Sequence, residues 1–115
     1  MKHTDLSYLK ELSNGSNQFM TEMITLFITQ TPEALDSMEK HLKNKDWKLL
    51  RTVAHKIKPS ISFVGLKEIE SDIRTVEESA ANETGLERLP DLISKINEVC
   101  NEGIKELKEE LVNFS

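Results

Sequence analysis

The segment that decides the fold is DWKLLRTVAHKIKPSISFVG, which runs from Asp46 to Gly65. Its apolar side chains recur alternately every three and four residues, which places them along one face of an α-helix. They are Trp47, Leu50, Ala54, Ile57, Ile61 and Val64. The spacing therefore predicts a helix that packs this face against a hydrophobic core.

His55 falls on the other side of this predicted helix. On a wheel of about 100° per residue it lies roughly 130° from the centre of the apolar stripe, so its imidazole is expected to face water. Polar side chains share that side within roughly 80° of one another. They are Lys48, Arg51, Lys58 and Ser62.

Two interpretations of this histidine are open from geometry alone. Neighbouring cations disfavour the protonated ring, so we expect a largely neutral imidazole, as a nucleophile must be. A surface histidine among lysines is also what an ordinary solvated helix face looks like.

The residues around His55 resemble a family motif. Ala54-His55-Lys56-Ile57-Lys58, followed by Val64-Gly65-Leu66, is similar to the signature of the histidine-containing phosphotransfer (HPt) domain, which is Ala-His-x-Leu/Ile-Lys-Gly with a later Gly-Ala or Gly-Leu. The resemblance extends over most of the chain. It includes Phe27, Pro32-Glu33, Asp46-Trp47 and Glu77.

The resemblance implies a role for each matching residue. His55 would be the phosphoacceptor, Lys58 the basic side chain that steadies the phosphoryl group, and Gly65 a helix end kept bare. From the helical wheel we add Arg51, which is expected to offset the charge of the phosphoryl group. The expected docking surface for the partner around His55 comprises Lys48, Pro59, Ser62, Phe63 and Gly65.

Pro59 and Phe63 are the two ambiguous positions on that surface. The family usually has a glycine where Pro59 stands, and a proline removes a backbone N–H and collides with the carbonyl of His55, so we expect a bend in the helix. Phe63 is expected near the exposed side, where it either anchors the partner or packs under a neighbouring loop.

The rest of the chain predicts further amphipathic helices. At 115 residues, with Glu, Lys and Leu abundant and only four glycines and three prolines, the sequence favours one helical domain over residues 1–115. The expected fold is all-α: an antiparallel up-and-down four-helix bundle with a short extra N-terminal helix.

The helix boundaries follow from caps and breakers. Thr4 or Asp5 is expected to cap the short helix, which would bury Leu6, Leu9 and Leu12. A second helix is expected from Ser16 or Asn17. Thr31-Pro32-Glu33 resembles a fresh helix start, whereas the family resemblance implies one long helix to about Asn44.

Two more helices complete the predicted bundle. One follows Leu66 and fades at Ala81-Asn82, with Glu77 on its solvated outer side, and the last begins near Pro90. Gly103, inside the last helix, marks either close helix packing or nothing.

The charge balance limits the classes of partner. A net charge of −5 argues against a general nucleic-acid or anionic-membrane binder, and no apolar run is long enough to span a membrane. Cys100 stands alone, which excludes an internal disulfide and fits a reducing compartment. With no apolar leader after Met1, we expect a cytoplasmic monomer.

The resemblance implies a phosphorelay intermediate rather than an enzyme. Its partners would be receiver domains of response regulators or of hybrid histidine kinases, which bring their own aspartates and Mg²⁺. The chain itself is expected to bind no metal or other cofactor, and it lacks the glycine-rich loops that cradle nucleotide phosphates.

Two rival functions differ from this one in what they require of the sequence. A di-iron bundle enzyme would need Glu-x-x-His pairs, but Met38 and Thr52 stand three residues before His41 and His55. The second rival function is that of a helical adaptor, which binds receivers or kinases without accepting phosphate. This alternative remains open, and Pro59 favours it as a sign of lost transfer geometry.

Overall fold

The computed structural model describes residues 3–114, and this part of the chain is entirely helical. Its helices are α1 (Ser7–Ser13), α2 (Asn17–Lys43), α3 (Trp47–Phe63), α4 (Glu70–Asn82) and α5 (Leu89–Leu111), with short 3-10 turns η1 (Lys67–Ile69), η2 (Leu86–Arg88) and η3 (Val112–Phe114). The predicted all-α fold is confirmed.

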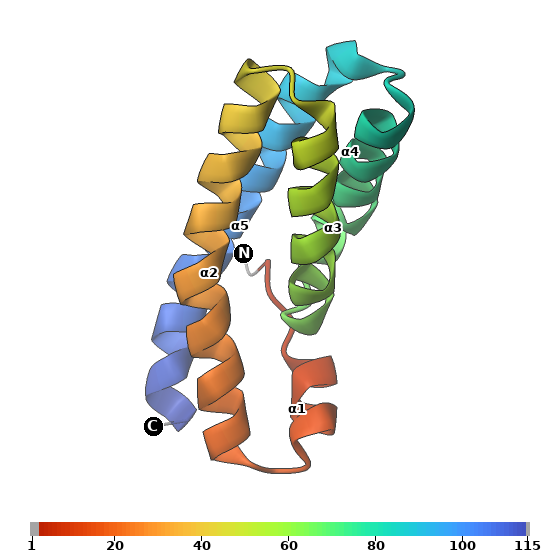
Figure 1. Cartoon of the computed structure of the whole chain (residues 1–115). Helices are drawn as coiled ribbons and strands as arrows, with labels where there is room; N and C mark the ends of the chain where they lie inside the picture. The colour runs from red at the N-terminus through yellow and green to blue at the C-terminus, as the bar shows by residue number, and fades with distance from the viewer. Residues whose placement is uncertain (1–2, 115) are drawn as a thin grey trace.

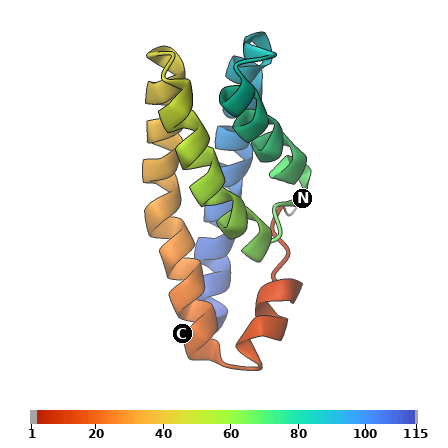
Figure 2. The same cartoon turned by 45° about the vertical axis from the view of Figure 1, so that its right-hand side comes forward.

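The four long helices run alternately up and down (Figure 1). The longest two, α2 and α5, pack along each other, while α3 and α4 pair with each other over one half of the bundle. Figure 2 shows the short helix α1 beyond the end of α3, next to the half of α2 that α3 leaves uncovered. This is the expected four-helix bundle with an extra N-terminal helix.

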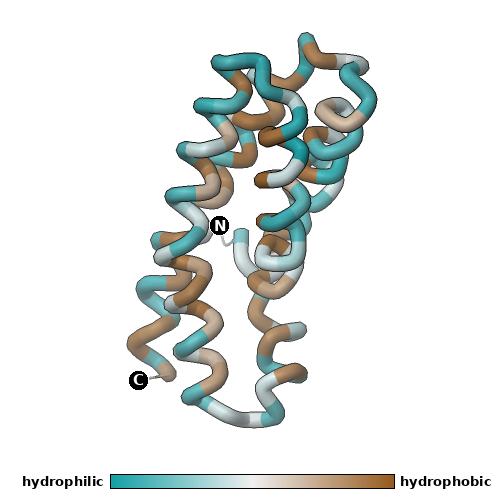
Figure 3. Tube along the Cα trace, viewed as in Figure 1, coloured by the Kyte–Doolittle hydropathy of each residue, from teal (hydrophilic) through white to brown (hydrophobic). Residues whose placement is uncertain are grey.

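The core forms from the periodic apolar positions, which recur along every long helix (Figure 3). In α3 the predicted stripe is buried apart from Trp47, which is partly buried. One prediction of burial was wrong: Leu12 is 47% exposed. It lies at the edge of an apolar stripe, where periodicity does not show whether a neighbouring helix covers it.

Helix α2 is continuous through Pro32. Ser16 caps it, because its hydroxyl accepts a hydrogen bond from the Phe19 N–H at 3.1 Å. A proline inside a helix removes one backbone hydrogen bond, yet Thr31 and Leu35 on either side are buried in the core. Tertiary packing therefore overrides the local helix-start signal, as the family resemblance implied.

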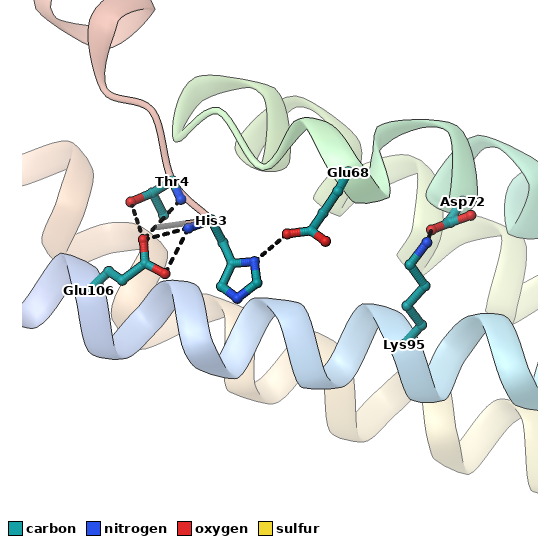
Figure 4. A network of polar contacts seen from close by, with 6 residues as sticks. All are labelled: His3, Thr4, Glu68, Asp72, Lys95 and Glu106. Atoms are coloured by element: carbon teal, nitrogen blue, oxygen red, sulfur yellow. Dashed lines mark hydrogen bonds and ion pairs between the residues drawn. The ribbon is translucent and has the colours of Figure 1, made fainter. Parts of the chain in front are cut away.

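The segment before α1, residues 3–6, forms an N-terminal arm that is held to the bundle by polar contacts (Figure 4). The Glu106 carboxylate accepts hydrogen bonds from the His3 N–H, the Thr4 N–H and the Thr4 hydroxyl, at 2.8–3.0 Å. Thr4 was expected to cap α1, but its hydroxyl is used here instead. Asp5 accepts from the Ser7 N–H, and α1 begins at Ser7.

The arm crosses two glycines. Gly65 has φ +69°, and a Cβ built on it would lie 2.2 Å from the Asp5 carbonyl oxygen. A Cβ on Gly103 would lie 3.1 Å from Leu66 and 3.4 Å from Thr4, so this glycine marks close packing. The prediction that Gly65 offers its surface to a partner was wrong: it is buried beneath the arm.

A contact of the arm is expected to make the stability of the protein depend on pH. His3 Nδ1 bonds Glu68, and this contact raises the pKa of His3 above its ordinary value against the opposing effect of burial. A raised folded-state pKa means that the contribution is complete below about pH 6.5 and is lost as the pH rises through the raised value. His3→Gln should therefore lower the melting temperature at pH 6 more than at pH 9, with His41→Gln as the control; equal losses at both pH values would contradict this.

Candidate functional site

The candidate site lies midway along α3, on the side away from the core. Asp46 begins this helix, with its carboxylate accepting from the Leu49 N–H at 3.2 Å. Leu50, Ala54 and Ile57 are buried on the inner face, which turns His55 outward. The His55 side chain is 69% exposed, as the helical wheel predicted.

The imidazole is nevertheless held by a carboxylate from the neighbouring helix. His55 Nδ1 lies 2.7 Å from Oε2 of Glu77 on α4, and Lys58 Nζ lies 2.8 Å from the other carboxylate oxygen. Glu77 is only 16% exposed. The sequence indicated only cations and Ser62 around this ring and did not reveal the carboxylate beside it; the predicted solvated position of Glu77 was wrong.

Glu77 is ionised in this arrangement. The hydrogen bond from Lys58 lowers the pKa of Glu77, partial burial opposes it, and the hydrogen bond from His55 lowers it further. An ionised carboxylate can only accept hydrogen bonds, so the proton of a neutral His55 ring must be on Nδ1. The lone pair is then on Nε2, the ring nitrogen that Glu77 leaves free.

The other predicted basic residues take different places. Lys58 is bound to Glu77, the same carboxylate that contacts His55. Arg51, one turn before His55, is exposed, and its side chain forms no ion pair or hydrogen bond within residues 3–114. Unlike Lys58, Arg51 is therefore an unpaired cation on this face of the helix.

The predicted docking residues differ in how exposed they are. Lys48, Pro59 and Ser62 are exposed on the His55 side of α3. Phe63 is partly buried and stacks on Tyr8 of α1, with ring centroids 6.0 Å apart and planes 9° apart. Phe63 is thus partly covered by the N-terminal helix, while Tyr8 remains 49% exposed beside it.

Sequence reasoning treated Glu77 as a surface residue, although a local signal was available. Glu77 directly follows buried Val76 and lies four residues after buried Ile73, which places it at the border of the stripe that α4 turns toward its neighbours. A carboxylate at such a border can reach across to the next helix.

A helical bundle with this motif on the exposed face of one helix has the features of a histidine-containing phosphotransfer domain. A family model described as the Hpt domain matches residues 22–112. The chain therefore belongs to the Hpt domain family, whose members are phosphocarriers of two-component signalling rather than enzymes.

A solved structure agrees with this family over nearly the whole chain. The crystal structure of histidine-containing phosphotransfer protein B (HptB) from Pseudomonas aeruginosa PAO1 matches with a TM-score of 0.87 and 25% sequence identity. The match covers 98% of this chain and 97% of that one. No curated protein matches the sequence.

Two kinds of feature are absent from the residues that the structure describes. In the part of the chain that the structure describes, no helix is long and apolar enough to cross a membrane. Residues 3–114 also hold no group of three or more histidine, cysteine and acidic side chains arranged for a metal ion.

Proposed function

We propose that this protein is a phosphorelay intermediate that accepts a phosphoryl group on Nε2 of His55 from the phosphoaspartate of one receiver domain and passes it to the aspartate of another. The observation that carries the proposal is the contact between His55 Nδ1 and Glu77 in a side chain that is 69% exposed. It orients the ring and leaves its other nitrogen accessible.

The transfer follows from this geometry. The Nε2 lone pair attacks phosphorus in line, the N–P bond forms, and the P–O bond to the aspartate breaks with the carboxylate as leaving group. The ring keeps its Nδ1 proton and becomes cationic, and the Glu77 carboxylate stabilises that charge. In the return step a second aspartate attacks phosphorus and His55 leaves as the neutral imidazole.

The chain itself would contribute position and charge to this step. Arg51 would face the incoming phosphoryl oxygens, while Lys58 would hold the Glu77 carboxylate in place; exposed contacts of this kind contribute on the order of 0.2–1 kcal/mol each. The receiver domain would supply Mg²⁺ and the acidic residues that bind it. The chain would bind no nucleotide and would not phosphorylate itself from ATP.

A transfer assay tests the proposal. The protein is incubated with Mg²⁺ and each phosphorylated receiver domain of the source organism, and label on the protein is analysed for acid lability, base stability and the position of the phosphorus on the ring. Rapid labelling at Nε2 is expected. Tight binding of a receiver with no label would support the adaptor function instead, and label at Nδ1 would contradict the role given to Glu77.

Glu77→Gln should slow phosphotransfer by about 100-fold, the lower end of the range for losing a side chain that positions a proton in catalysis. A glutamine cannot neutralise the cationic ring, and its amide N–H₂ can instead bond Nδ1 and force the proton onto Nε2. We expect the loss in the maximal rate at saturating receiver, with the binding of the receiver unchanged.

Glu78→Gln is the matched control for this substitution, because Glu78 is the next residue on α4 and is exposed. The tautomer of His55, measured by ¹⁵N chemical shifts, gives a second readout that a general loss of stability would not change. A Glu77→Gln protein that transfers at the parent rate would remove Glu77 from the mechanism.

A further inference from the structure

One charged hollow near His55 is not used by the transfer chemistry. It lies between α3 and α4, has a volume of about 300 Å³, and is lined by Lys58, Pro59, Ser62, Glu70 and Arg74. Lys58 and Pro59 come three and four residues after His55 on the same helix. The hollow is therefore one helical turn from the proposed phosphoacceptor, toward the end of α3.

Arg74 is the unpaired cation of this hollow. Its side chain is exposed and, among residues 3–114, forms no ion pair or hydrogen bond. Glu70 stands one turn earlier on α4, at the spacing that favours a helical ion pair, yet the two do not pair. The charge of Lys58 is already taken by Glu77 at 2.8 Å.

We propose that Arg74 is a specificity-determining residue whose guanidinium binds an acidic side chain of the docking receiver domain in this hollow. The inference rests on the proposed function, because it assigns a contact to the partner of the same transfer reaction. Arginine suits the task because its planar fork binds a carboxylate with two parallel hydrogen bonds.

The position of Pro59 supports a contact at this place. Pro59 is exposed and lines the hollow, so a partner meets a rigid ring there that offers no hydrogen-bonding group. The hydrogen-bond donors left in the wall belong to side chains. Arg74 is the one with the largest number of free donors.

Glu70 makes the direction of the change in receiver binding testable. Because its carboxylate lines the same hollow, it repels the acidic side chain that Arg74 attracts. Arg74→Gln should weaken docking and Glu70→Gln should strengthen it. A purely structural role for either residue would not produce opposite effects on binding.

The experiment uses the receiver domain that labels His55 fastest in the transfer assay. For Arg74→Gln we expect KM for the phosphorylated receiver, and Kd for the unphosphorylated one, to rise about three- to tenfold with kcat unchanged. For Glu70→Gln we expect both to fall about twofold. Arg88→Gln, an exposed arginine of η2 beyond the far end of α4, is the matched control.

A small phosphodonor separates this inference from the proposed function. Phosphoramidate needs no protein docking, so it should label His55 in the Arg74→Gln protein at the parent rate. Arg74→Gln with KM and Kd within a factor of two of the parent would overturn the inference while leaving the relay intact. A rise in KM for Glu70→Gln would also overturn it, since the partner would then be presenting a cation. If no receiver labels the parent protein, the proposed function fails first.

Discussion

Replacing His55 with glutamine is expected to abolish phosphotransfer labelling while leaving the bundle folded. Glutamine has no ring nitrogen that can attack phosphorus, and the other described histidines have different surroundings: His3 is engaged by Glu68 and Glu106, and His41 is partly buried in the last turn of α2. The measurement is the label retained after incubation with the most active phosphorylated receiver domain and Mg²⁺. We expect none above background.

The stability of the same variant separates a lost nucleophile from a lost fold. Because His55 is exposed, its replacement should change the free energy of unfolding by no more than about 0.5 kcal/mol. A glutamine amide at this position can still donate a hydrogen bond to Glu77, so Lys58 need not rearrange. Urea denaturation of parent and variant should therefore give the same midpoint.

His41→Gln is the control for this prediction and should be labelled like the parent. Label that persists in His55→Gln would place the phosphoacceptor elsewhere and end the relay proposal. A variant that still binds the receiver with parent affinity but carries no label would show that docking and chemistry are separable. That outcome is expected if the docking surface surrounds His55 without depending on it.

Local patterns in the sequence were sufficient for the helices and the exposed side of α3. The alternation of three and four residues fixes which face of a helix is apolar, and Ser16 and Asp46 cap helices through short contacts within their own turns. The resemblance corrected the misleading local signal at Pro32. These features depend on residues close together in the sequence.

The contacts that local patterns could not predict join distant segments. Thr4 bonds Glu106 rather than the first turn of α1, and His55 meets Glu77 from another helix. A helical wheel shows which way a side chain points but not which neighbour stands there. The histidine was correctly placed on the exposed side, whereas its orienting carboxylate was mistaken for part of a solvated face.

Gly65→Ala is expected to destabilise the protein by about 2–4 kcal/mol, within the range of severe single substitutions. The left-handed backbone, at φ +69°, costs a residue with a Cβ on the order of 1–2 kcal/mol. The methyl group would also lie 2.2 Å from the Asp5 carbonyl oxygen, so the arm must move. That movement would strain the hydrogen bond from the Asp5 N–H to the Val64 carbonyl, which is 2.9 Å long.

Gly15→Ala supplies the matched control, because Gly15 also has a left-handed backbone, at φ +85°, but a Cβ there meets nothing within 4 Å. In urea denaturation it should lose only the stability that comes from the left-handed backbone, on the order of 1–2 kcal/mol. Hydrogen exchange should show the amide of Asp5 opening faster in Gly65→Ala than in Gly15→Ala. Equal losses in the two variants would mean that the arm does not constrain Gly65. Slower transfer by Gly65→Ala protein under conditions where it is still folded would return this glycine to the docking surface.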